Sequence, residues 1–134
     1  MILIAHLSDP HFGTEQAPVA AALRLLLARH APDGLALSGD ITQRARRGQF
    51  DAARDFGASL NVKTPLVIPG NHDIPLLNVV ARVFAPHAGF ARAFGPDLEP
   101  IVTLPGVMMI GVNTTRRFRH VDGEVSAAQI ARVA

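Results

Sequence analysis

The stretch that decides the fold reads Leu66-Val67-Ile68-Pro69-Gly70-Asn71-His72-Asp73. Its first three residues are aliphatic and predict a short buried strand, which the Pro-Gly pair ends abruptly. An amide, an imidazole and a carboxylate follow directly on one tight loop. In an open α/β sheet, ligands bind beyond the carboxyl ends of the strands. The stretch therefore predicts a strand whose carboxyl end carries the polar groups of a site.

The same arrangement occurs twice earlier in the chain. The apolar run 2–7 ends in Ser8-Asp9-Pro10-His11, and the run 35–37 ends in Ser38-Gly39-Asp40. Carboxylate, imidazole and amide groups form a mixed oxygen and nitrogen ligand set that suits a divalent transition metal. If the three strands are parallel neighbours, the polar side chains that converge at one edge of the sheet are those of Asp9, His11, Asp40, Asn71 and His72.

Each motif taken alone has a simpler explanation. Asn and Asp in a turn often bond to their own backbone, and a single Asp after a strand often caps a helix. The three motifs together, each at the end of an apolar run, favour a metal site over these local roles.

Three ordered blocks resemble the calcineurin-like metallophosphoesterases: Asp9-x-His11, Gly39-Asp40 and Gly70-Asn71-His72-Asp73. The flanking residues 8–13 and 38–44 also resemble the branch that contains class III cyclic-nucleotide and glycerophosphodiester phosphodiesterases. The resemblance covers nearly the whole chain. It implies an α/β fold built from βαβ units, which in the full family is a four-layer αββα sandwich.

The resemblance also implies a binuclear metal centre. Asp9 and His11 are implied to bind the first ion, Asp40 to bridge both ions and Asn71 to bind the second. The ions are implied to be divalent or trivalent, drawn from Mn, Fe, Zn, Co or Ni. The implied reaction is hydrolysis of a small phosphodiester or phosphomonoester by attack of a metal-bound hydroxide on phosphorus.

Two residues of the turn are the predicted catalytic residues. By resemblance, His72 protonates or stabilises the leaving oxygen as a general acid. Asp73 is expected to orient His72 by accepting a hydrogen bond from its other ring nitrogen.

The substrate-binding candidates are Arg44 and Asn113. The chain has a net charge of +2, with twelve arginines and one lysine, and its arginines cluster at 44–47 and 116–119. A solvated rim is the common explanation for such short clusters, but a guanidinium also suits phosphate, and Arg44 lies four residues after Asp40. Asn113 follows a predicted strand, with a turn role as the equal alternative. Phe is the only aromatic residue type and neither cluster interleaves with it as in single-strand platforms, so nucleic acid is not an expected partner.

Hydrophobic periodicity predicts strands and helices in alternation along the chain. A helix that starts at Pro18 carries an apolar stripe formed by Val19, Leu23, Leu26, Leu27 and His30. A second helix is predicted over 48–60, and a short helix around 90–94. Between them, one helical face is formed by Leu76, Val79, Val80, Val83 and Phe84. The chain then continues with an antiparallel hairpin of 101–104 and 107–112 and a helix that begins at the capping box of Ser126.

Length and composition limit the class of protein. A chain of 134 residues is long enough for one domain with a sizeable core. It has no cysteine, so disulfides and thiolate metal sites are excluded. The start lacks a basic n-region and no apolar run reaches the roughly 20 residues of a bilayer span, so a cytoplasmic protein without membrane contact is expected. His120 is expected to face solvent in a polar loop.

The sequence departs from the family after His72. A later histidine and a Gly-His-x-His block complete the family's metal ligands, whereas the only later histidines here are His87 and His120. Residues 1–134 are therefore expected to be the amino-terminal portion of one domain, truncated in a helix, with impaired or no hydrolase activity. Self-association is expected to cover the exposed surface of such a chain.

Two other functions were compared with the hydrolase. The first is a non-catalytic module of the same fold that self-associates and binds metal weakly. The second is a nucleotide-binding α/β domain, which ranks lower because the sequence has no Gly-x-Gly-x-x-Gly or Gly-Lys-Ser/Thr loop.

Overall fold

Three parallel strands form the sheet that positions the site. The computed structural model describes residues 1–119 and 121–134, so the expectation for His120 lies outside the described residues. The strands are β1 (Ile4–Ser8), β2 (Gly34–Ser38) and β3 (Pro65–Val67), in the order β1-β2-β3. Ala5 pairs with Leu35, and Leu35 pairs with Pro65. The expected α/β class with βαβ units is confirmed, with strand boundaries within two residues of those predicted.

The helix α2 (Arg47–Ser59) packs most closely on this sheet. Phe50, Ala53 and Phe56 are spaced three residues apart on one face, and all three are buried. Together with Leu35 and Leu37 of β2 they form the centre of the hydrophobic core. The predicted helix over 48–60 is confirmed.

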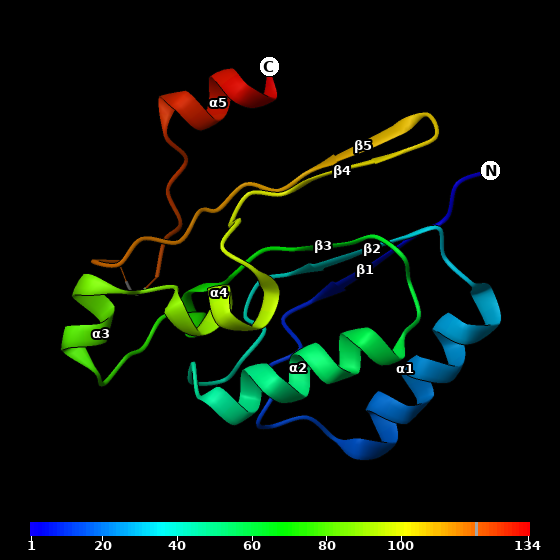
Figure 1. Ribbon diagram of the computed structural model, residues 1–134, viewed down its shortest axis with the longest axis horizontal. Helices are drawn as coiled ribbons and strands as arrows, with labels where there is room; N and C mark the ends of the chain where they lie inside the picture. The colour runs from blue at the N-terminus through cyan, green and yellow to red at the C-terminus, as the bar shows by residue number, and fades with distance from the viewer. Residues whose placement is uncertain (120) are drawn as a thin grey trace.

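The helix α1 (Ala17–His30) is where expected, but it buries less than its stripe predicts. Leu27 is buried, whereas Val19 and Leu26 are 61% and 52% exposed. Figure 1 shows α1 and α2 together on one side of the strands. Leu27, with Ala20 and Leu23 partly buried, is the part of α1 that packs against the core, and the rest of its apolar stripe stays in solvent.

The second half of the chain begins with three short helical segments. These are the single 3-10 turn η1 (Asn71–Asp73), α3 (Val79–Phe84) and α4 (Ala88–Phe94). The predicted short helix around 90–94 is confirmed by α4, whose Phe90 is fully buried in the core on the α2 side. The predicted apolar face of α3 is not buried, because Val79, Val80 and Phe84 are 66%, 68% and 82% exposed.

A hairpin and a last helix complete the fold. β4 (Ile101–Leu104) pairs antiparallel with β5 (Val107–Ile110), as predicted, and Gly106 takes the positive φ of 79° in the turn. The helix α5 (Ala127–Val133) starts at Ser126, whose side chain accepts a hydrogen bond from the backbone of Gln129. The predicted hairpin and capping box are therefore confirmed. Figure 1 shows the hairpin and α5 on the side of the sheet away from α1 and α2.

The carboxyl ends of β1, β2 and β3 lie at one end of the molecule. Figure 1 shows α3 and the long segment between β5 and α5 at this same end. The helices of the described residues are all too short or too polar to cross a bilayer. The fold thus gathers the loops that carry the sequence motifs at one end of the sheet.

Candidate metal centre

The loops after β1 and β2 run side by side and bring Asp9, His11 and Asp40 together. Asp9 N donates to Ser38 O at 3.0 Å, and His11 N donates to Asp40 O at 3.0 Å. A parallel bridge between Phe12 and Thr42 continues this pairing past the strand ends. The two motifs are therefore held by backbone hydrogen bonds.

Asp9 and His11 have a backbone conformation that is unusual for residues with side chains. Their φ angles are 52° and 45°, in the left-handed region, on either side of Pro10. Positive φ outside glycine costs of order 1–3 kcal/mol and is concentrated at functional sites. In this conformation both side chains are placed beside Asp40.

Three potential ligand atoms meet at the strand ends, from His11, Asp40 and His72. They all lie within 4.8 Å of one another. Each imidazole Nε2 lies 3.9 Å from Asp40 Oδ2. This distance is too long for a hydrogen bond, but two ligands each about 2.1 Å from one ion lie up to about 4.2 Å apart. The spacing therefore fits a shared cation better than direct pairing.

The two ring nitrogens of His11 differ in their surroundings. Nε2 is the atom near Asp40 Oδ2, whereas Nδ1 is buried and has no hydrogen-bond partner among the described residues. The ring lies edge-on to that of His72, with centroids 5.2 Å apart. The oxygen and nitrogen donors gathered here fit a divalent transition metal.

Asp9 is held beside this cluster as a carboxylate. Its Oδ1 accepts from Asp40 N at 3.1 Å, and its Oδ2 accepts from the Ser8 hydroxyl. The Ser8 hydroxyl, then the Asp40 N–H, and more weakly the charges of His11 and His6 hold the pKa of Asp9 below its ordinary value. The carboxylate is therefore kept in the form that binds cations.

Two glycines allow the carboxylates to come this close. A Cβ at Gly70 would lie 2.2 Å from Asp40 Oδ1, and a Cβ at Gly39 would lie 2.5 Å from Asp9 Oδ1. Any larger residue at either position would displace a carboxylate. This contact explains why glycine precedes Asp40 and Asn71 in the motifs.

Asn71 reaches the same place from β3. A cavity of about 320 Å³ is lined by Asp9, Asp40 and Asn71 at the strand ends. The segment after β5 contributes most of the remaining lining, through Val112, Thr114, Thr115, Arg116, Arg119, Val121, Asp122 and Gly123. The structure thus brings Asp9, Asp40 and Asn71 to one cavity and His11 to the same carboxylate of Asp40.

His72 is fixed at two points. Its backbone N–H donates to Asp40 Oδ1 at 2.9 Å, and its Nδ1 lies 2.9 Å from the carbonyl oxygen of Gln43. Because Nδ1 donates to that carbonyl, Nε2 is the ring atom directed at the site. The expected orienting acceptor was Asp73, but the Gln43 carbonyl occupies that position.

Asp73 has a structural position instead. It is fully buried and accepts hydrogen bonds from Gly70 N, Ile41 N, and both the N–H and the hydroxyl of Thr42, at 2.7 to 3.1 Å. Burial raises the pKa of Asp73 to about 6, and these hydrogen bonds act in the opposite direction. Asp73 therefore joins the Asn-His-Asp turn to the loop after β2.

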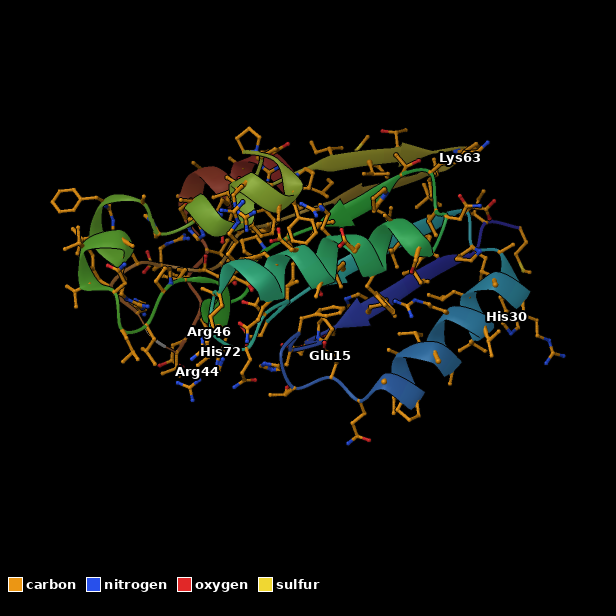
Figure 2. The ribbon with its side chains drawn as sticks, turned by 60° about the horizontal axis from the view of Figure 1, so that its bottom comes forward. Glu15, His30, Arg44, Arg46, Lys63 and His72 are labelled. Carbon is orange, nitrogen blue, oxygen red and sulfur yellow. The ribbon has the colours of Figure 1, made fainter. Side chains whose placement is uncertain are left out.

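The two predicted substrate residues lie outside the lining of this cavity. Arg44 is exposed and lines a separate hollow with Arg46 and Leu76. Figure 2 shows Arg44, Arg46 and His72 at the same end of the molecule, opposite His30 and Lys63. The Asn113 Oδ1 accepts from the N–H and hydroxyl of Thr115 at 3.0 and 2.6 Å, which is the turn role given as its alternative.

Two arginines of the cluster that was not preferred for substrate binding line the cavity. They are Arg116 and Arg119, from the second arginine cluster. The available signal was their position a few residues beyond the end of a predicted strand, as for Arg44. This position is shared by both arginine clusters, so it could not show which cluster lines the cavity.

Comparison with known proteins agrees with this geometry. Residues 2–123 match the family model described as calcineurin-like phosphoesterase. The chain is 34% identical over 85 residues to the glycerophosphodiester phosphodiesterase GpdQ of Enterobacter lignolyticus, covering 54% of this chain and 30% of that protein. It is 27% identical over 138 residues to a Synechococcus protein named as a probable cyclic nucleotide phosphodiesterase, covering 95% of this chain and 49% of that protein.

These matches define what the chain is related to. It spans about half the length of the Synechococcus protein and about a third of the Enterobacter protein. The family match covers all three strand-end motifs and the segment that lines the cavity. The chain belongs to the calcineurin-like phosphoesterase family.

Proposed function

We propose that this chain takes part in metal-dependent hydrolysis of small phosphodiesters, with a binuclear metal centre at the strand ends. The observation that carries the proposal is the cavity lined by Asp9, Asp40 and Asn71 at the strand ends, together with the 3.9 Å between His11 Nε2 and Asp40 Oδ2. The printed names of the two relatives, which refer to glycerophosphodiesters and cyclic nucleotides, support this class of substrate.

The proposed ligand set divides between two ions. Asp9 and His11 would hold one ion and Asn71 the other, and Asp40 would contribute to both. Asp40 suits this role because its Oδ2 lies 3.9 Å from His11 Nε2, on a carboxylate whose Oδ1 is fixed by the backbone N–H of His72. When bound, such ions supply positive charge to the phosphate oxygens and make water more acidic.

His72 is the proposed general acid. With Nδ1 donating to Gln43 O, the protonated ring carries its second proton on Nε2, which is the atom that faces the site. That proton passes to the leaving oxygen as its bond to phosphorus breaks, while the oxygen of water bonds to phosphorus and the water gives up one proton to solvent.

Replacing His72 by alanine is expected to lower kcat by about 10²–10⁴-fold, the usual contribution of a general acid. The metal content of the variant is expected to stay at the wild-type level, because His72 is not among the proposed ligands. The measurement is steady-state hydrolysis together with elemental analysis. His30→Ala, at the opposite end of the molecule, is the matched control (Figure 2). A loss of bound metal in proportion to the loss of activity would instead make His72 a ligand.

The proposed function is tested with a chromogenic phosphodiester, bis(p-nitrophenyl) phosphate. Slow hydrolysis is expected when manganese is added to the metal-free chain, because the family's later histidine ligands are absent from the sequence. It is expected to stop when the metal is chelated. Absence of hydrolysis from a chain that binds manganese would reject the catalytic proposal and leave a metal-binding module.

One observation favours the second candidate, a non-catalytic module that self-associates. β1 has β2 on one edge only, and on α1 the apolar side chains of Val19, Leu25 and Leu26 are more than half exposed. An open strand edge beside apolar side chains is a common surface for association.

Sedimentation velocity is expected to show concentration-dependent association of the chain. The physical reason is the removal of this apolar surface from water, which contributes about 25 cal/mol per Å². Leu25→Glu and Leu26→Glu together are expected to shift the distribution to monomer. Sedimentation of the wild-type chain as a monomer at high concentration would count against self-association.

A further inference from the structure

The cavity at the strand ends has a second group of lining residues that the proposed function does not use. The strand-end loops contribute Asp9, Asp40 and Asn71, and the segment after β5 contributes Arg116 and Arg119. We propose that Arg116, assisted by Arg119, binds the phosphate oxygens of the substrate within this cavity. The inference rests on the proposed function, because it assigns the group that holds the anion next to the metal centre.

The backbone separates these two arginines from their neighbours. Arg119 N donates to Arg116 O at 3.0 Å, which closes a turn with Arg117 and Phe118 at its tip. The ends of the turn line the cavity, whereas Arg117 is exposed, donates to Val83 O at 2.8 Å and lies 5.4 Å from the Phe118 ring. Only part of the basic cluster therefore reaches the site.

The guanidinium of Arg116 is held in place before any ligand binds. Its Nη1 donates to the carbonyls of Asn113 and Thr115 at 3.0 and 2.9 Å, and its Nη2 donates to Gln129 Oε1 at 3.0 Å. A guanidinium has five N–H donors, and the described residues supply acceptors for three of them. The other two have no acceptor among the described residues, and Arg116 lies between this cavity and a second hollow that Asn113 and Gln129 line. A fixed planar guanidinium is well suited to phosphate, because little side-chain freedom is lost on binding.

Gln129 connects this guanidinium to the start of α5. Its side-chain amide donates to the Glu99 carboxylate and, at 2.8 Å, to Asn113 O, while its Oε1 also accepts from Ser126 N at 2.8 Å. The charge of Glu99 is paired with Arg132, at 3.2 Å. The fixed orientation of Arg116 thus comes from neutral acceptors. The hydrogen bonds from Gln129 and Asn113, and then the charges of Arg132 and Arg116, hold the pKa of Glu99 below its ordinary value.

The charges that line the cavity suit an anionic ligand. Such a ligand would contact bound metal cations on the side of Asp9 and Asp40, and arginine on the side of the segment after β5. Asp9 and Asp40 would repel a phosphate unless bound cations offset them. Asp122 also lines the cavity, and Arg119 forms an exposed ion pair with Glu124 at 3.2 Å. Exposed pairs of this kind contribute little, so Arg119 is the secondary group. Arg116 is the group on which the proposal depends.

The test measures binding of inorganic phosphate to the manganese-loaded chain by isothermal titration calorimetry, which requires no turnover. Arg116→Ala is expected to raise the Kd for phosphate about 10- to 100-fold, the range of a lost charge-assisted hydrogen bond. Arg117→Ala, which removes the adjacent arginine outside the cavity, is expected to leave the Kd unchanged. Manganese affinity is expected to be equal in all variants.

Arg116→Lys keeps the charge but loses the planar fork, and is expected to give an intermediate Kd. Circular dichroism confirms that each variant is folded, and Arg116→Lys decides the case if Arg116→Ala does not fold. A phosphate Kd unchanged in a folded Arg116 variant, or weakened equally by Arg117→Ala, would overturn the proposal. Failure of the proposed function is seen separately, as a wild-type chain that binds manganese and phosphate but does not hydrolyse the diester.

Discussion

Replacing Asp40 by asparagine is expected to abolish hydrolysis and to weaken manganese binding by at least about 100-fold. Loss of a partner outside the ligand set typically costs 10–100-fold in metal affinity, so loss of a central carboxylate costs at least the upper end of this range. Asp40 Oδ1 accepts from the His72 backbone, and asparagine retains an oxygen for that bond. The variant therefore removes charge with little change of shape. The measurements are calorimetric titration with manganese and hydrolysis of bis(p-nitrophenyl) phosphate.

Asp55→Asn is the matched control for Asp40→Asn. Asp55 is exposed on α2, where its partner is Arg54 at 2.9 Å. The same loss of one negative charge at this position is expected to leave metal affinity and activity unchanged. Equal metal binding by the Asp40 variant and the wild type would remove Asp40 from the centre.

Replacing Asp73 by alanine is expected to lower the free energy of unfolding by about 3 kcal/mol or more. The substitution leaves three buried backbone N–H groups and one hydroxyl without their acceptor, and each unsatisfied group costs about 1–3 kcal/mol before relaxation. A loss of this size in a chain of this length lowers Tm by about 10 °C. The measurement is thermal and urea unfolding followed by circular dichroism.

Asp73→Ala is expected to lower stability and, because Asp73 holds the Asn-His-Asp turn, to weaken metal affinity as well. Asp55→Ala again serves as the control, since it removes an exposed carboxylate, and its Tm is expected to stay within about 2 °C of wild type. An Asp73→Ala variant with unchanged Tm but reduced kcat would restore the original expectation that Asp73 acts with His72 in catalysis.

The sequence motifs predicted the arrangement of the metal centre because it depends on topology. Once β1, β2 and β3 are parallel neighbours, the residues that follow them meet at one edge of the sheet. The meeting of Asp9, His11 and Asp40 therefore follows from their positions directly after the strands. The partners of individual polar atoms do not follow from topology. The carbonyl of Gln43 took the place expected for the Asp73 carboxylate because a loop from β2 folds over the turn.

The sequence also could not predict how deeply each helix is buried, or which of the two arginine clusters lines the cavity. The apolar stripes of α1 and α3 have helical spacing, but burial depends on how much sheet surface remains for each helix to cover. In the same way, Arg44 and Arg116 both follow strand ends, and only the path of the segment after β5 places Arg116 in the cavity.

The account rests on cations held at the ends of the three parallel strands. The most direct test is an anomalous difference map from a crystal soaked in manganese, recorded where manganese scatters anomalously. We expect two peaks about 3.5–4 Å apart, enclosed by Asp9, His11, Asp40 and Asn71, with Asp40 between them. Manganese bound elsewhere on the molecule, with no peak beside Asp40, would contradict the account.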